Sequence, residues 1–172
     1  AGFDATWVKA DLSFRGLRQT LFEPKGRVHI GEQPTVLQRQ DQDATRFIAE
    51  LRIDQVAGYS GGSGSWFKDV VIPFNPELTA IIGNKGSGKS AVADILGLLG
   101  ESRQFEHFSF LTDKTQNRKF RQKGYAENFV GTLSWASGAK PEKRLDQDVD
   151  LRKPEVVKYL PQNYFESLTN EI

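Results

Sequence analysis

The chain contains no cysteine and no methionine, and its apolar runs are only a few residues long. The absence of cysteine excludes disulfides, thiolate zinc sites and cysteine nucleophiles, and it fits a reducing compartment. A membrane-spanning helix needs about 20 consecutive apolar residues, which no part of the sequence provides. Residues 1–7 lack the basic region and the apolar core of a signal peptide. We therefore expect a cytoplasmic protein with no membrane contact.

An excess of charge of either sign is also missing. Lys and Arg together number 23 and Asp and Glu 22, so the net charge is +1 and any nucleic-acid site has to be a local basic patch. With 38% hydrophobic residues, the 172-residue chain can build the core of one domain with a short appendage. The lack of methionine and the end of the chain at Ile172, inside an expected helix, indicate a piece of a longer protein. A small protein without its initiator is the alternative.

Two units are expected along the chain. In residues 1–40, Ser13 caps a helix over residues 14–22, and a short strand follows at residues 27–30. The polar, Gln-rich stretch 31–45 is typical of a linker.

The second unit, residues 46–172, mixes the periods of strands and helices. Its first half is expected to contain antiparallel strands at 47–53 and 69–74 around a flexible loop at 58–65, and then a buried strand at 78–82. A helix is expected at 91–99. The last part is expected to contain strands at 129–136 and 155–160 around a charged loop at 140–153, and the start of a helix at 163–172. This order predicts an α/β fold that includes an antiparallel β-subdomain.

The pattern G-x-x-x-x-G-K-[ST] occurs between the buried strand and the helix, where Gly83, Gly88, Lys89 and Ser90 fill its fixed positions. Glycines let the backbone curl so that successive N–H groups point inward, and the following helix adds its positive N-terminal dipole. Lys89 supplies a mobile charge for the β- and γ-phosphates, and the Ser90 hydroxyl is a ligand for Mg²⁺. ATP with Mg²⁺ is therefore the expected ligand. A glycine-rich turn with a stray lysine is the alternative.

The contact residues follow from the same motif. Those expected to contact the nucleotide are Gly83, Asn84, Lys85, Gly86, Ser87, Gly88, Lys89, Ser90 and Ala91. Hydrolysis also requires an acidic partner for Mg²⁺ at the end of a buried strand. No run of four apolar residues precedes Asp-Asp or Asp-Glu, and the apolar stretch 70–72 ends in Pro73. We expect the chain alone to bind ATP without hydrolysing it efficiently.

A second polar element, Pro161-Gln162, ends the expected strand 155–160. Alone, a Pro-Gln pair is typical of a solvated turn. Beside the phosphate loop, Gln162 is expected to contact Mg²⁺ and the attacking water. The expected catalytic residues are therefore Lys89 and Gln162, and the expected metal ligands are Ser90 and Gln162.

Two antiparallel strands, a buried strand, the loop at residues 83–90 and a strand that ends at Gln162 resemble the N-terminal lobe of an ABC-type ATPase head. The resemblance is closest to the SMC-like group of P-loop NTPases, which acts on nucleic acids. In that family a glutamine loop has the role expected of Gln162, and two heads associate with ATP between them. The family's signature motif, aspartate strand, catalytic glutamate and switch histidine have no counterpart in this sequence.

A narrower resemblance includes the first unit. Residues 7–11 (WVKAD), 14–19 (FRGLRQ) and 23–28 (EPKGRV) look like the tail of a PHP (polymerase and histidinol phosphatase) phosphoesterase domain. Followed by the phosphate loop and residues 157–166, this order is similar to TrlF-type proteins, in which a PHP domain precedes an SMC-like ATPase.

The resemblance implies that residues 1–40 are the end of a PHP-like domain plus a linker. It also implies that the ATPase gates an attached metal-dependent phosphoesterase or nuclease that acts on nucleic acid. Clustered His and Asp residues bind the metal in PHP domains. His29 and His107 are not part of such a cluster, so no metal ligand is carried over.

Two alternatives stay open. A nucleic-acid-binding or assembly module without turnover would use the basic, aromatic-containing stretch at residues 118–125, which is also compatible with a solvated loop. A P-loop kinase or GTPase would use the same phosphate loop, but the guanine-specific sequence Asn-Lys-x-Asp is absent.

Overall fold

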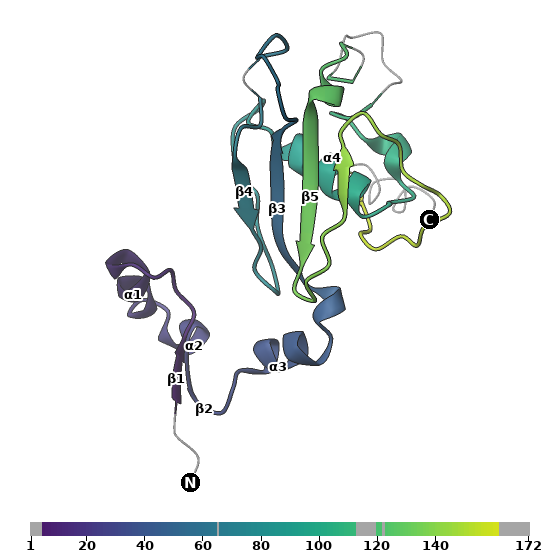
Figure 1. Cartoon of the computed structure of the whole chain (residues 1–172). Helices are drawn as coiled ribbons and strands as arrows, with labels where there is room; N and C mark the ends of the chain where they lie inside the picture. The colour runs from purple at the N-terminus through teal and green to yellow at the C-terminus, as the bar shows by residue number, and fades with distance from the viewer. Residues whose placement is uncertain (1–4, 65, 113–119, 122, 162–172) are drawn as a thin grey trace, which may run out of the picture.

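The computed structural model describes residues 5–64, 66–112, 120–121 and 123–161. These residues form a mixed α/β structure with two antiparallel sheets (Figure 1). The small sheet pairs β1 (Ala5–Val8) with β2 (Val28–Gly31), and the large sheet has the strand order β4-β3-β5-β6. The α/β class expected from the sequence is confirmed at this level.

The first unit contains the predicted capped helix and a strand pair. Helix α1 (Phe14–Thr20) begins where the Gly16 N–H donates to the Ser13 hydroxyl at 3.1 Å, and it ends two residues earlier than predicted. The short helix α2 (Pro24–Arg27) leads into β2, close to the strand expected at residues 27–30. Strand β1 was not predicted, because a four-residue segment at the start of the sequence has little periodicity to detect.

The linker predicted at residues 31–45 contains helical structure that the sequence analysis did not predict. That stretch contains helix α3 (Thr35–Gln42) and the 3₁₀ turn η1 (Ala44–Arg46). Polar composition suggested a linker, yet the eight residues after Pro34 include neither glycine nor proline. Leu, Gln and Arg among them have good helix propensity, and this local preference decides the conformation.

The large sheet confirms three of the predicted strands. Its strands are β3 (Ile48–Gln55), β4 (Val70–Pro73), β5 (Phe129–Trp135) and β6 (Glu142–Arg144). Strand β3 pairs antiparallel with β4, as predicted, and also with β5, a pairing that the sequence did not indicate. Strand β6 falls in the predicted charged loop at 140–153, where a charged three-residue edge strand leaves no apolar signal.

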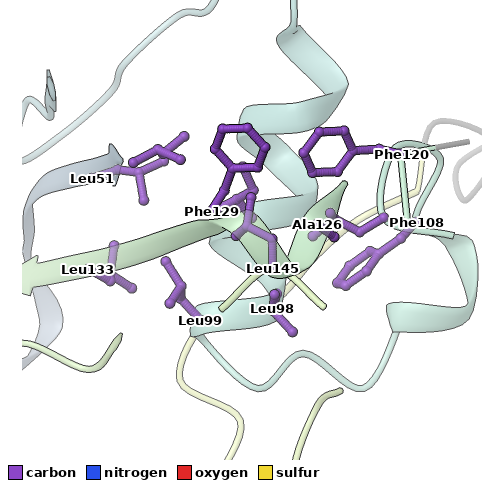
Figure 2. Packing of buried hydrophobic residues seen from close by; sticks show 12 residues of the cluster. Leu51, Leu98, Leu99, Phe108, Phe120, Ala126, Phe129, Leu133 and Leu145 are labelled. Atoms are coloured by element: carbon purple, nitrogen blue, oxygen red, sulfur yellow. The ribbon is translucent and has the colours of Figure 1, made fainter. Parts of the chain in front are cut away.

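Helix α4 (Lys89–Leu99) lies behind this sheet and covers one of its faces (Figure 1). Its fully buried side chains Ile95 and Leu98 pack in one cluster with residues of the sheet such as Leu51 and Leu133 (Figure 2). Gly131 on β5 permits this close approach, because a Cβ there would lie 3.1 Å from the Ile95 side chain. The helix predicted at residues 91–99 is confirmed, and the sheet holds it in place through its apolar face.

Aromatic side chains close the end of the core beside the β3–β4 connection. Phe129 lies with its ring centroid 5.7 Å from Phe67 and 5.5 Å from Phe120, and Phe110 stacks on Phe120 at 4.6 Å. The 3₁₀ turns η2 (Phe105–His107) and η3 (Ala126–Asn128) place part of this cluster. The irregular stretch that follows α4 therefore contributes to the core despite its polar composition.

Two predicted strands are not formed. Residues 78–82 and 155–160 have no strand geometry, and Leu78 and Ile82 are 80% and 90% exposed. A strand exists only when its N–H and C=O groups pair with a neighbour, and no strand among the described residues pairs with either segment. The buried strand predicted at 78–82 and the strand predicted at 155–160 are therefore wrong, and the two sheets among the described residues are antiparallel.

Candidate nucleotide-binding site

The loop at residues 83–88 is curled and open to solvent. Gly86 and Gly88 have φ angles of 86° and 90°, a region that favours glycine, and the Ser87 N–H donates to the Asn84 carbonyl at 3.2 Å to close a turn. Gly83 leaves room for this turn, because a Cβ there would lie 2.4 Å from the Ser87 hydroxyl. The glycine spacing read from the sequence thus produces the backbone curvature that it predicted.

The N-terminus of α4 continues this concave backbone. Its N-cap is Gly88, whose lack of a side chain leaves the first N–H groups of the helix without a side-chain cap. Such groups carry the positive end of the helix dipole and bind anions. Ala91 is buried, so its contribution to a ligand is limited to its backbone.

The Lys89 side chain folds back over the loop. Its Nζ donates to the Gly83 carbonyl at 2.7 Å and to the Asn84 carbonyl at 2.9 Å, with the Ser87 hydroxyl at 3.5 Å. The ammonium group therefore lies against the turn that Asn84 and Ser87 close. A phosphate at the mouth of α4 would meet backbone donors and one full positive charge together.

A cavity of about 580 Å³ adjoins the loop. Lys89 and Ser90 line it at one end, and the segment 157–161 forms a wall of it opposite α4. Pro161 is buried in this wall. Of the predicted Pro-Gln element, the structure places Pro161 at the cavity beside α4. Gln162 lies outside the described residues, as does the helix start predicted at 163–172.

Sequence reasoning missed a buried acid next to this cavity. Asp94 on α4 is fully buried, and its Oδ2 accepts hydrogen bonds from the N–H groups of Phe110 at 2.6 Å and Leu111 at 3.1 Å. Burial raises the pKa of Asp94 although these hydrogen bonds oppose the shift. Its signal in the sequence was an aspartate within the apolar helical face that contains Ala91 and Ile95.

Tyr159 on the facing wall is the second missed residue. Its ring packs edge-on against Phe108 with centroids 5.1 Å apart. Burial raises the pKa of Tyr159 to about 12, and the charge of Asp94 adds to the shift. The neutral phenol is therefore the form that this wall accommodates.

We expect Tyr159 to make the folded state sensitive to alkaline pH. Its pKa is about 12 in the folded chain and 10.0 ordinarily, so the unfolded chain loses the proton first and stability falls as pH rises from 10 to 12. The free energy of unfolding can fall by at most about 1.4 kcal/mol per pH unit from this one group. Because Tyr159 is partly exposed, we expect the free energy of unfolding to fall by only about 1 kcal/mol. Urea unfolding of the wild type and Tyr159→Phe at pH 9 and 11 measures it. Equal losses in both proteins would contradict this role.

For the basic stretch at residues 118–125, the sequence left a nucleic-acid contact and a solvated loop open, and the structure describes part of it. The Arg121 side chain is only 9% exposed, pairs with Asp148 at 3.1 Å and donates to the Leu145 carbonyl at 2.8 Å. Arg121 therefore holds the loop after β6 and is not an exposed phosphate contact. Lys123 lies over the Tyr125 ring at 5.5 Å, and Arg118 is outside the described residues.

Comparison with protein-family models, with curated proteins and with solved structures yields no match. Among the described residues, no three His, Asp or Glu side chains gather as a metal site. Within the same residues no helix combines the length and the apolarity that crossing a membrane requires. A functional interpretation therefore depends on the geometry of the loop and of the cavity beside it.

Proposed function

We propose that this chain binds ATP with Mg²⁺ at residues 83–91, as part of a P-loop NTPase of the ABC/SMC-like type. The observation that carries the proposal is the Lys89 ammonium held 2.7 Å and 2.9 Å from two carbonyls of a glycine loop at a helix N-terminus. This combination supplies backbone donors, a helix dipole and one mobile charge to the same phosphate group. The cavity of about 580 Å³ next to Ser90 supports the proposal, since it offers space for the end of the triphosphate.

Each polar group at the loop has a proposed part. The N–H groups of residues 84–91 bind the phosphate oxygens, and Lys89 neutralises the β- and γ-phosphates. The exposed Ser90 hydroxyl fits Mg²⁺, which prefers oxygen ligands and commonly keeps several waters besides one protein ligand and the phosphates. Gln162, the residue after the cavity-lining Pro161, is proposed to contact the same ion and the attacking water.

Turnover is proposed for the complete protein and not for this chain alone. Among the residues that the structure describes, those lining the cavity beside Ser90 include no carboxylate, which an efficient hydrolytic Mg²⁺ site requires. We propose that a second head associates with this one across the bound nucleotide and completes the site. Nucleic acid is the proposed target of the activity attached to it, and the cytoplasm the proposed location.

The first unit gives the proposed ATPase a connection to that attached activity. Lys9 pairs with Glu77 at 3.5 Å and Arg39 pairs with the same carboxylate at 3.3 Å. Glu77 precedes the segment 78–82, which leads into the loop at residues 83–88. We propose that residues 1–40 are the end of a PHP-like phosphoesterase domain and that movement of the loop is passed to it along this route.

Titration of the chain with ATP, GTP and a single-stranded oligonucleotide tests the proposal. We expect ATP to bind with a Kd in the micromolar range when Mg²⁺ is present, and more weakly in EDTA. Retention of the oligonucleotide without ATP binding would favour the nucleic-acid or assembly module instead, and equal affinity for GTP would favour another P-loop class such as a kinase. No binding of any nucleotide would refute the proposed function.

A further inference from the structure

One face of the strand pair β1–β2 gathers aromatic and cationic residues. Trp7 lies opposite His29 in the antiparallel register, and the Lys9 N–H donates to the Arg27 carbonyl at 2.7 Å, which continues the register by two positions. Side chains alternate between the faces of a strand, and directly opposite residues share a face. These four residues therefore form one array, with an aromatic pair at one end and a cationic pair at the other.

A cavity of about 400 Å³ opens on this array, whose four residues all line it. Lys25 of α2 also lines it, and its other walls include the half-buried Val36 and Leu37 of α3 and the turn at residues 75–77. The strand pair lies outside the large sheet, near α3 (Figure 1). This cavity shares no lining residue with the cavity beside the phosphate loop, so the two are separate candidate sites.

Trp7 is held in place at the aromatic end of the array. Its Nε1 donates to the Gly31 carbonyl at 3.2 Å, and the residue is half-buried. A ring that is already fixed loses little conformational entropy when a ligand binds against it. Every nucleobase has a π-face, so a ring of this kind stacks with bases of any sequence.

Positive charge predominates at the other end. The Arg27 guanidinium is fixed beside the cavity, because its Nε donates to Glu23 Oε2 at 2.9 Å and its Nη1 to the Lys9 carbonyl at 3.3 Å. Lys25 is exposed, and its ammonium has no ion-pair partner among the described residues. Glu77 is the one acid among the described lining residues, and it is paired with Lys9 at 3.5 Å. The remaining positive charge favours an anion such as a phosphate.

We propose that this cavity binds one nucleotide unit of a single-stranded nucleic acid, with the base against Trp7 and the phosphate at Lys25 and Arg27. The inference deepens the proposed function and rests on it for nucleic acid as the target. Single strands can turn a base out to meet an aromatic side chain, whereas the bases of a duplex stay stacked on one another. A free mononucleotide has the same chemistry and is therefore one arm of the test.

Fluorescence anisotropy with labelled oligouridylate tests which ligand the cavity takes. We expect binding by the full chain in the micromolar range at low salt. Unlabelled oligouridylate should displace the probe at concentrations at least about tenfold lower than UMP, a duplex of the same length or polyglutamate of equal charge. Equal displacement by UMP would assign the site to free nucleotides, and equal displacement by the duplex or by polyglutamate would reduce it to a charged surface. Each of these results overturns the proposal.

Two variants separate stacking from charge. Trp7→Ala should lower the affinity for the oligonucleotide about tenfold without changing its salt dependence, and Trp7→Phe, which keeps a ring, should recover most of the loss. Lys25→Ala should weaken binding and lower the slope of log K against log salt by about 1. The exposed residues Trp66 and Lys140 give the matched controls Trp66→Ala and Lys140→Ala, which should stay within about twofold of wild type.

The exposed position of Lys25 keeps the test decisive if Trp7→Ala does not fold, since Lys25→Ala removes no buried contact. Wild-type affinity and salt dependence in Lys25→Ala refute the cavity as the site. Lys89→Ala separates this inference from the proposed nucleotide site, because it should lose ATP and retain the oligonucleotide. A chain that binds ATP but no oligonucleotide refutes the inference alone. Binding of the oligonucleotide that depends on Trp7, in a chain that binds no ATP, refutes the proposed ATP site alone.

Discussion

Replacing Lys89 with alanine is expected to lower the affinity for ATP by at least about 100-fold. The wild-type ammonium lies 2.7 Å from the Gly83 carbonyl and 2.9 Å from the Asn84 carbonyl, within reach of a phosphate at the same turn. A hydrogen bond to a charged group contributes about 1.5–3 kcal/mol, and Lys89 is proposed to bind two phosphates. Isothermal titration calorimetry with Mg²⁺ and ATP measures the loss.

Two further variants show whether the charge of Lys89 or its position at the loop determines the affinity for ATP. Lys68→Ala removes the same charge from an exposed site and should leave the affinity within about twofold of wild type. Lys89→Arg keeps the charge but replaces a compact ammonium by a wide planar fork, so we expect an intermediate loss. If Lys89→Ala binds ATP as the wild type does, the site assignment is wrong.

Replacing Phe129 with alanine is expected to destabilise the chain by about 3–5 kcal/mol, which is much of the stability of a domain of this size. The Phe129 side chain is 0% exposed on β5, between the sheet and the aromatic cluster (Figure 2). Its ring lies 5.4 Å from Tyr59 in addition to its contacts with Phe67 and Phe120. Truncation therefore removes buried apolar area and leaves a cavity that these neighbouring rings cannot fill.

Urea unfolding followed by tryptophan fluorescence measures this loss. Phe14→Ala is the matched control, since the Phe14 side chain is 80% exposed and its removal should change stability by no more than about 0.5 kcal/mol. ATP binding by Phe129→Ala should fall only in proportion to the unfolded fraction, because Phe129 does not line the cavity beside the loop. A loss of stability below about 1 kcal/mol would show that the aromatic cluster is not the core.

Short-range patterns in the sequence predicted the elements that depend on neighbouring residues. The Ser13 cap, strand β3 and the turn at Gly86 and Gly88 all formed as expected. Each follows from side-chain size, backbone freedom or alternation within a few positions. The same reasoning missed helix α3 within the linker predicted at residues 31–45, because the polar composition was weighed and the good helix propensity was not.

The strands predicted at 78–82 and 155–160 failed for a different reason. Their apolar, β-branched composition suits a strand, but a ladder also needs a partner at the right distance, which composition does not specify. Strand β6 shows the converse case. Its three charged residues form a strand because the outer edge of β5, at Val130 and Thr132, is available for pairing. Strand formation in these segments was decided by neighbours and not by propensity.

By itself the sequence determined the curled loop at residues 83–88, the position of Lys89 after it and the helix that follows, because a few consecutive residues contain all the conformational information that the turn requires. The tertiary structure alone decided that Asp94 would be buried beside Tyr159 and that Ser102 would meet Glu155. These pairs are far apart in the chain, and their contact follows from how α4 packs between the sheet and the returning segment. Burial, which turns such polar groups into specific contacts, is a property of that packing and has no local signature.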